Sequence, residues 1–316
     1  MSLHRYTILL CLFGLSSSMM NAQTKNFSYN NMDSWVRRDI KESRIIGGET
    51  KTIWEVGAPA HNTKAEAWNQ GDSPWETTSI YAHIMGIDKV SSTVFPEKRG
   101  DGYCARMETR LEEVSALGII HITALSTGTL FTGRLIEPIQ GIDNPMEKMS
   151  QGIPFTKRLK AIKFDYKAKT GGKRIKASAL SKADVAGANA AEVCVFLEKR
   201  WEDQEGNIKA KRIATAYLRI TKSTPDWVNG FVLPLNYGDI TQQPFYRKYM
   251  QLNDDEYPQY ALNSQGKIKH VDEVGWGDKN DQPTHLIVRF AAGFGGPYIG
   301  AVGDCLWIDN VEFIEE

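Results

Sequence analysis

The sequence is poor in cysteine and histidine and carries no net charge, and each of these features excludes a class of protein. Only 4 Cys and 6 His occur in 316 residues. Three cysteines follow the N-terminal segment, Cys104, Cys194 and Cys305. An odd number cannot form a fully paired disulfide framework, and no two have the spacing of metal ligands. The apolar runs around Cys194 and Cys305 favour buried free thiols, with one disulfide as the alternative.

Lys and Arg number 38 together, as do Asp and Glu, so charge gives no reason to expect nucleic acid or an acidic membrane surface as a partner.

The sequence also lacks the local motifs of common hydrolases. It has no Gly-x-Ser-x-Gly elbow and no His-Glu-x-x-His pair, and its histidines are scattered. Glycosidases need two carboxylates held about 5–10 Å apart, but no Asp or Glu stands in a context that identifies such a pair. The acidic run at residues 254–256 is more typical of a solvated loop.

The N-terminus has the pattern of a secretory signal peptide over residues 1–22. Arg5 supplies the positive charge, residues 7–15 form an apolar core, and Met20-Asn21-Ala22 is a plausible cleavage site. The apolar run is too short to cross a bilayer, so no transmembrane anchor is expected. The pattern predicts export to the periplasm, the cell surface or the medium.

After this segment, short strand-like runs separated by turn residues dominate the chain. Runs of this kind occupy residues 119–124, 161–166, 192–197, 213–218, 231–235, 285–290 and 306–314. The near absence of helical periodicity between them predicts an all-β fold, an antiparallel β-sandwich with long loops and little helix. Single helical turns are expected at residues 181–187 and 245–252. With no repeat and no linker, residues 23–50 are interpreted as an extended lead-in whose only anchor is Trp35, and residues 51–316 as one domain.

Four motifs in sequence order carry a family resemblance. They are residues 128–134 (GTLFTGR), 152–166 (GIPFTKRLKAIKFDY), 226–237 (DWVNGFVLPLNY) and the closing strand, 300–313. Together they resemble the putative carbohydrate metabolism domain of secreted Bacteroidetes proteins. The resemblance implies a jelly-roll sandwich but no particular reaction. The chain departs from the family pattern at residues 291–297, where a serine-rich stretch is usual, so polar contacts of those serines cannot be transferred.

Asp309 interrupts the apolar closing strand and therefore needs a hydrogen-bonding or cationic partner. In related carbohydrate-binding jelly rolls, the aspartate at this place helps to hold a structural Ca²⁺ together with an acidic residue near the N-terminus. The resemblance thus implies a calcium site at Asp309 and Asp33, and Ca²⁺ prefers such oxygen ligands. The alternative is that Asp309 caps a turn or accepts backbone hydrogen bonds.

Tryptophans in turn-rich segments are the candidate sugar platforms. The C–H face of a pyranose packs on a flat apolar ring while polar side chains bind its hydroxyls. Trp54, Trp75, Trp201 and Trp276 lie in segments broken by Gly, Pro or acidic residues. For each of them, packing a loop against the core is the alternative.

These observations predict an exported glycan-binding protein without catalytic activity, whose partner is a glycan or polysaccharide. Two alternatives stay open: a glycoside hydrolase, or another glycan-active enzyme, and a structural or adhesive surface protein.

Overall fold

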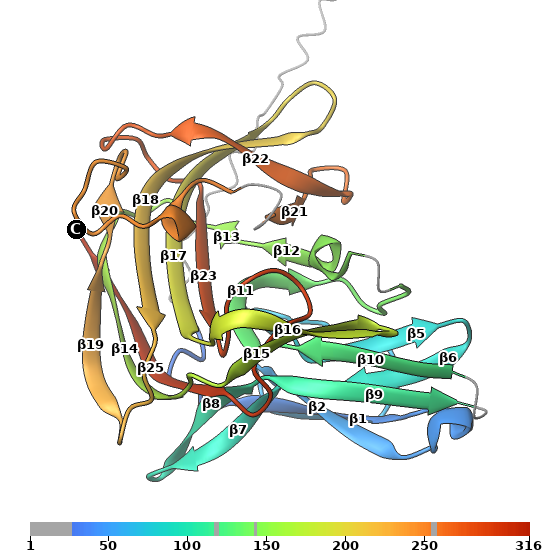
Figure 1. The fold of residues 1–316 in the computed structure, drawn as a ribbon. Helices are drawn as coiled ribbons and strands as arrows, with labels where there is room; N and C mark the ends of the chain where they lie inside the picture. The colour runs from blue at the N-terminus through green and yellow to red at the C-terminus, as the bar shows by residue number, and fades with distance from the viewer. Residues whose placement is uncertain (1–26, 117–119, 142–143, 254–257) are drawn as a thin grey trace, which may run out of the picture.

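The structure is a computed structural model in which residues 27–116, 120–141, 144–253 and 258–316 are described. Strands make up almost all of its regular structure (Figure 1). Three 3-10 turns are the helical elements of these ranges: η1 (Arg44–Ile46), η2 (Pro145–Lys148) and η3 (Lys248–Met250). No helix in the described part has the length and apolar character needed to span a bilayer. The predicted signal peptide lies outside the described residues.

The larger layer is a ten-stranded sheet that curls on itself. Its strands, in spatial order, are β13 (Ile153–Pro154), β23 (His285–Ala291), β17 (Ala191–Glu202), β18 (Ile208–Ile220), β22 (Ile268–Trp276), β21 (Tyr260–Leu262), β12 (Met149–Gln151), β11 (Thr129–Leu135) and β4 (Trp75–Thr77), with β20 (Asn236–Tyr237) beside β18. Because β11 also pairs with β23, the sheet path returns to its own start. One face of β17, β18 and β23 therefore looks into the curl.

The second layer is a five-stranded sheet that covers the other face of β17 and β23. It comprises β19 (Val228–Pro234), β14 (Leu159–Lys169), β25 (Cys305–Glu315), β8 (Gly102–Glu108) and β7 (Val94–Arg99). Phe164 from this layer meets Phe290 of the larger sheet edge-on, with ring centroids 5.4 Å apart. Alternate apolar residues of both sheets fill the space between them in one continuous core.

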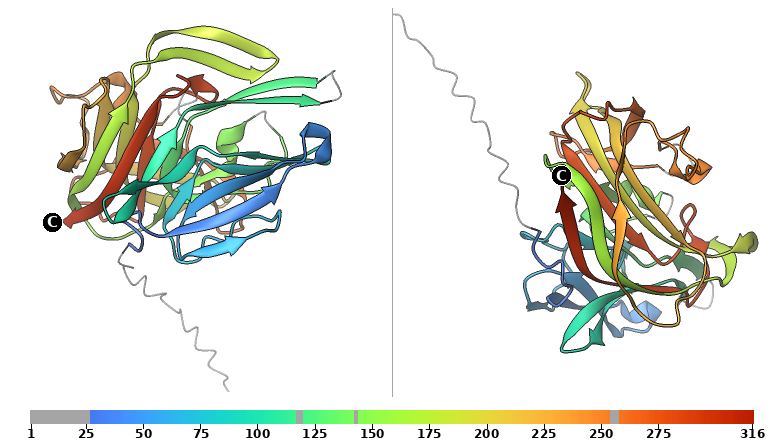
Figure 2. Two further views of the ribbon diagram at one scale, coloured as in Figure 1. Left: turned by 90° about the horizontal axis from the view of Figure 1, so that it is seen from below. Right: turned by 90° about the vertical axis from the view of Figure 1, so that its left-hand side faces the viewer.

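Smaller sheets flank the sandwich at the end where the N-terminal half of the chain lies. One contains β2 (Thr50–Val56), β1 (Trp35–Lys41) and β3 (Ala60–Asn62), and β5 (Ile80–Ile84) pairs with β6 (Ile87–Ser91). A further sheet joins β16 (Ser181–Ala188), β15 (Lys173–Ala179), β10 (Ile120–Ser126) and β9 (Arg110–Ala116), with β24 (Ile299–Gly300) beside β15. Figure 2 shows the β9–β10 and β15–β16 hairpins extending away from the sandwich.

The predicted β-sandwich with little helix is confirmed, and every predicted strand run overlaps a strand, although residue 119 lies outside the described residues. Most strand pairs are antiparallel, although β18 pairs with β22 in parallel. Two local predictions are wrong. Residues 181–187 belong to strand β16, because they pair with β15. Trp35 is not the only anchor of the lead-in, since Val36 and Ile40 of β1 are also buried. The three cysteines of the described chain are free and buried.

Candidate functional site

The site begins with the alternation of side chains along β17. Val193, Val195 and Leu197 point into the sandwich core, so Glu192, Cys194 and Phe196 point to the opposite face, into the curl. Strand register then places partners beside them. Cys194 lies opposite Tyr217 of β18 on one side and Arg289 of β23 on the other. The curl thus carries a row of polar, aromatic and charged side chains.

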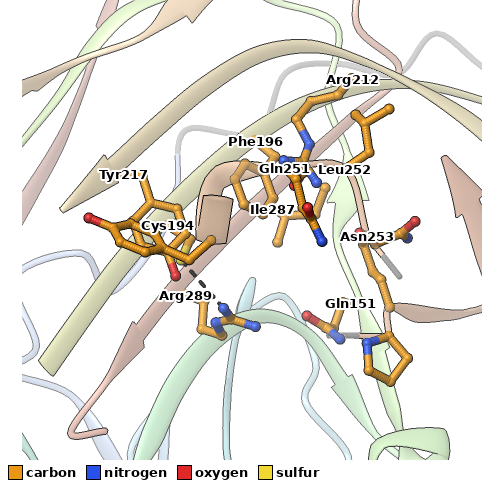
Figure 3. A pocket seen from close by; sticks show the side chains of 13 residues that line it. Gln151, Cys194, Phe196, Arg212, Tyr217, Gln251, Leu252, Asn253, Ile287 and Arg289 are labelled. Carbon is orange, nitrogen blue, oxygen red and sulfur yellow. Dashed lines mark hydrogen bonds between the residues drawn. The ribbon is translucent and has the colours of Figure 1, made fainter. Parts of the chain in front are cut away.

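A small cavity of about 40 Å³ lies inside the curl (Figure 3). Its floor is formed by side chains of β17, β18 and β23, and the segment around η3 forms its roof. The residues that line it are Gln151, Cys194, Phe196, Arg212, Tyr217, Tyr249, Gln251, Leu252, Asn253, Pro258, Gln259, Ile287 and Arg289. These residues come from distant parts of the chain, and the curl of the sheet brings them together.

Glu192 is the centre of an ionic cluster at one side of the cavity. Its Oε1 accepts hydrogen bonds from the Tyr217 hydroxyl at 2.6 Å and from Arg219 Nε at 2.8 Å. Burial, together with the negative charge of Glu192, raises the pKa of Tyr217. The Arg219 guanidinium lies between two aromatic rings, 3.7 Å from the Tyr249 centroid and 4.1 Å from the Phe294 centroid. Such cation–π stacking fixes Tyr249 over the edge of the cavity.

A second ionic cluster holds the roof. Arg212 forms a bidentate ion pair with Glu273, with Nε 2.7 Å from Oε1. The Nη1 of the same guanidinium donates to the carbonyl oxygens of Met250 and Gln251 at 3.2 and 2.8 Å. Arg212 and Glu273 are buried, where ion pairs with satisfied hydrogen bonds are retained and broken ones are strongly destabilising. Arg212 therefore ties the roof segment to the floor of the cavity.

Two donors of the cavity have hydrogen-bonding capacity to spare. Gln151 is 3% exposed, and its Nε2 has no hydrogen-bond partner among the described residues. Arg289 uses Nη2 to approach Cys194 Sγ at 3.4 Å and Glu192 Oε2 at 3.8 Å, and its Nε and Nη1 donate no hydrogen bond within the described ranges. A buried donor without a partner, such as Gln151 Nε2, is rare in folded proteins. These two donors are the groups that an oxygen-rich ligand would satisfy.

Cys194 faces the same cavity but is a poor nucleophile. Its side chain is fully buried, and burial raises the pKa of the thiol above its ordinary value even though Arg289 lies beside it. A thiol must ionise to attack. Cys194 therefore acts as a small packing residue of the floor.

The four predicted platform tryptophans do not come together. Trp75 is fully buried and packs near Phe290, with centroids 6.1 Å apart. A side chain without exposed surface cannot stack on a sugar, so the platform prediction for Trp75 is wrong.

Trp201 is 42% exposed at the end of β17. Trp54 lies in β2, 6.0 Å from the Arg37 guanidinium, and Trp276 ends β22, 5.6 Å from that of Arg212. Glycan contact at Trp54, Trp201 and Trp276 stays a prediction.

Asp309 has a protein cation as its partner. Arg99 Nη1 lies 2.6 Å from Asp309 Oδ2 and 2.8 Å from Asp165 Oδ2, and the guanidinium stacks on Trp227 at 3.8 Å. Asp33 accepts the backbone N–H of Tyr103 at 2.8 Å. A calcium ion needs six to eight oxygen ligands, whereas the described residues contain no group of three or more His, Cys, Asp or Glu side chains placed for a metal. As arranged, these donors do not fit Ca²⁺, and calcium at Asp309 and Asp33 stays an untested prediction.

Sequence reasoning missed Gln151, Tyr249 and Arg289. One signal was present, because Cys194 and Phe196 alternate with core residues and indicate a strand covered on both faces. Nothing in the sequence tells which distant segments provide that second cover.

The fold and this cavity define a β-sandwich protein with a small cavity inside its curled larger sheet. The family model for the putative carbohydrate metabolism domain matches residues 42–314, and the chain belongs to this family.

No curated protein matches the chain. Two similar solved structures are described as putative glycoside hydrolases. The one from Bacteroides thetaiotaomicron has 13% identity and a TM-score of 0.43, over 85% of this chain and 81% of that one. The one from Bacteroides vulgatus has 14% identity and a TM-score of 0.39, over 85% and 88%. Similarity at this level does not indicate what this chain does.

Proposed function

We propose that the protein is an exported glycan-binding protein without catalytic activity, and that the curl of β17, β18 and β23 is its binding site. The observation that carries the proposal is the buried, unpartnered amide of Gln151 in a cavity bordered by the stacked ring of Tyr249. Membership of a carbohydrate metabolism family supports the same class of ligand.

The size of the cavity supports entry of one polar group of a sugar at a time. A volume of about 40 Å³ accommodates one or two water-sized groups, so a sugar enters by a hydroxyl or hydroxymethyl group. The sugar ring then rests against Tyr249 at the edge, where its C–H face packs on the aromatic face. An unpaired buried donor destabilises the free protein by about 1–3 kcal/mol. A sugar oxygen that accepts a hydrogen bond from Gln151 Nε2 recovers this free energy when the sugar binds.

The carboxylates of the curl support binding over hydrolysis. Glu192 is bound by Arg219 and Tyr217. Burial alone would raise the pKa of Glu198, but the adjacent Arg200 outweighs burial and lowers it. A glycosidase acid must hold a proton near neutral pH, which a carboxylate with a lowered pKa does not. Burial raises the pKa of Glu273, but Arg212 binds both of its oxygens and Glu273 does not line the cavity.

A glycan array with the mature protein tests the proposal, followed by calorimetry with the best ligand. Tyr249→Ala should weaken binding tenfold or more, as loss of an aromatic side chain that carries much of the binding energy does. Phe245→Ala is the matched control, because Phe245 lies in the same segment, is 41% exposed and does not line the cavity. Equal loss in both variants would remove the site assignment.

Gln151→Met gives a second, independent readout. Methionine keeps the shape of the side chain and removes the unpaired donor, so this variant should weaken glycan binding while raising the melting temperature. A residue with a merely structural role would not show this opposite pair of effects. Release of reducing ends from a bound polysaccharide would instead establish the hydrolase alternative, and absence of any glycan binding would favour an adhesive protein.

The export part of the proposal rests on the pattern of residues 1–22. We expect the intact mass of protein expressed with its own N-terminus in a Gram-negative host to correspond to a chain beginning at Gln23. A full-length mass confined to the cytoplasm would contradict it.

A further inference from the structure

A second cavity, of about 390 Å³, lies outside the curl. It is bounded by the β5–β6 hairpin, strands β10 and β11, the η2 turn and residues 293–299. Figure 1 shows β5, β6 and β10 close together on one side of the molecule, with β11 nearer its centre. This volume falls in the range of small-molecule sites and is about ten times that of the glycan cavity.

The walls of this cavity are almost entirely apolar. They are formed by side chains such as Ile80, Ile84, Ile87, Leu125, Leu135 and Met149. An open apolar surface of this kind in contact with water is unfavourable by about 25 cal/mol per Å², and in soluble proteins it marks a binding site. It offers few hydrogen-bonding groups for sugar hydroxyls, so its ligand differs in chemistry from that of the curl.

The two basic residues of the lining, Lys89 and Arg289, differ in how far nearby carboxylates neutralise their charge. Lys89 is paired with Glu42 at 2.9 Å and lies 3.6 Å from Glu112. Arg289, which lines both cavities, shares the single carboxylate of Glu192 with Arg219. Around Glu192, two guanidinium groups and one carboxylate leave one positive charge in excess, whereas Lys89 with Glu42 and Glu112 leaves one negative charge in excess.

The positive charge that Glu192 does not neutralise resides on Arg289. Arg219 holds Glu192 with Nε and Nη2 and is stacked between two rings. Arg289 Nη2 lies 3.8 Å from the same carboxylate, which is too far for a hydrogen bond, and Nε and Nη1 donate no hydrogen bond within the described ranges. The Arg289 side chain is 23% exposed. Nη1 of Arg289 carries two N–H groups, and a carboxylate oxygen accepts such charge-assisted hydrogen bonds.

We propose that this cavity binds a soluble single-chain amphiphile with an anionic end, such as a long-chain carboxylate. The alkyl chain lies along the apolar walls between β5, β10 and β11, and the carboxylate pairs with Arg289. This inference does not depend on glycan binding, because the two cavities share only Arg289, and the apolar walls that hold the alkyl chain line the second cavity alone.

Calorimetry of the mature protein with octanoate, decanoate, dodecanoate and dodecan-1-ol tests both parts of the proposal. Affinity should rise about fourfold per methylene, the fold-change that corresponds to about 0.8 kcal/mol. Arg289→Gln should weaken dodecanoate binding roughly tenfold or more, as loss of a charged hydrogen bond does, and leave dodecan-1-ol binding unchanged. A misfolded variant would lose both ligands. Absence of chain-length dependence, or equal effects of Arg289→Gln on acid and alcohol, would overturn the proposal.

Filling the cavity provides the steric test. Ala124→Trp places a large ring into the lining and should abolish dodecanoate binding while glycan binding through the curl is retained. Ala183→Trp is the matched control, since Ala183 is exposed on β16 and lies outside the cavity. Tyr249→Ala should retain dodecanoate binding, which separates failure of this proposal from failure of glycan binding. If the wild type instead sediments as a dimer that Ala124→Trp dissociates, a second copy covers these walls and the amphiphile proposal is wrong.

Discussion

A buried acidic cluster near the N-terminal sheet should make stability depend on pH. Arg38 donates to Glu55 at 3.0 Å and to Glu137 at 2.6 Å. Thr77 connects two carboxylates, because its hydroxyl donates to Glu55 at 3.0 Å and its backbone N–H donates to Glu76 at 2.9 Å. One guanidinium cannot neutralise three buried carboxylates, so protons are retained in the cluster.

The pKa of Glu76 sets the size of this pH dependence. Burial, reinforced by the charge of Glu137, raises the pKa of Glu76 from 4.5 to about 7. Between these pH values the folded protein holds more protons than the unfolded chain, so this group makes stability fall as pH rises through the window. At about 1.4 kcal/mol per pKa unit, the difference corresponds to a loss on the order of 3 kcal/mol between pH 4.5 and 7.

His285 opposes this trend, so a variant is needed to isolate the contribution of Glu76. Burial lowers the pKa of His285 to about 4. The unfolded chain then binds the extra proton below pH 6.5, and stability rises with pH over nearly the same range. The difference in unfolding free energy between Glu76→Gln and the wild type cancels the contribution of His285.

Urea denaturation of both proteins from pH 4.5 to 8 measures this difference. Glu76→Gln should be destabilised at pH 4.5 by about 1–3 kcal/mol, because its amide cannot accept both backbone N–H groups that Glu76 accepts. Relative to the wild type it should then gain on the order of 3 kcal/mol by pH 7. Glu55→Gln, whose amide can donate to the Thr77 hydroxyl, should show a gain of the same sign. A difference that is constant with pH in both variants would refute the reasoning.

Three further predictions concern the tryptophans, the calcium site and the thiols. Trp75→Ala should lower the free energy of unfolding by about 3–5 kcal/mol, since Trp75 is fully buried, whereas Trp201→Ala should leave it nearly unchanged; equal melting temperatures would contradict this. Because Asp309 already has Arg99 as its cationic partner, a chelator should not change the melting temperature, and a fall that Ca²⁺ reverses would establish a calcium site. Cys194 should react with a thiol reagent only on unfolding, because it is buried with a raised pKa; labelling of the native protein at this residue would contradict the packing role.

The strands were predictable because their pattern is local. The alternation in residues 161–166 and 192–197 follows from burial of one or both faces of a sheet, and both runs form strands. Residues 181–187 were not predictable in this way. They are mostly exposed, so no burial pattern distinguishes a helical turn from an edge strand, and pairing with β15 decides the outcome.

The site was far less predictable than the fold. Gln151, Tyr249 and Arg289 are separated by long stretches of sequence and meet because the larger sheet curls. Trp75 lies in a segment rich in Gly and Pro but enters the core from the short strand β4. Composition can therefore indicate that aromatic side chains are available, but the tertiary pairing of strands decides which of them faces a ligand.

The most direct test of the central claim is the position of a bound glycan in a crystal structure of the mature protein with the best ligand from the array. The account predicts a sugar hydroxyl within hydrogen-bond distance of Gln151 Nε2 and a sugar ring packed against Tyr249. A glycan seated instead on Trp201 or on the N-terminal sheet, with the curl unoccupied, would contradict it.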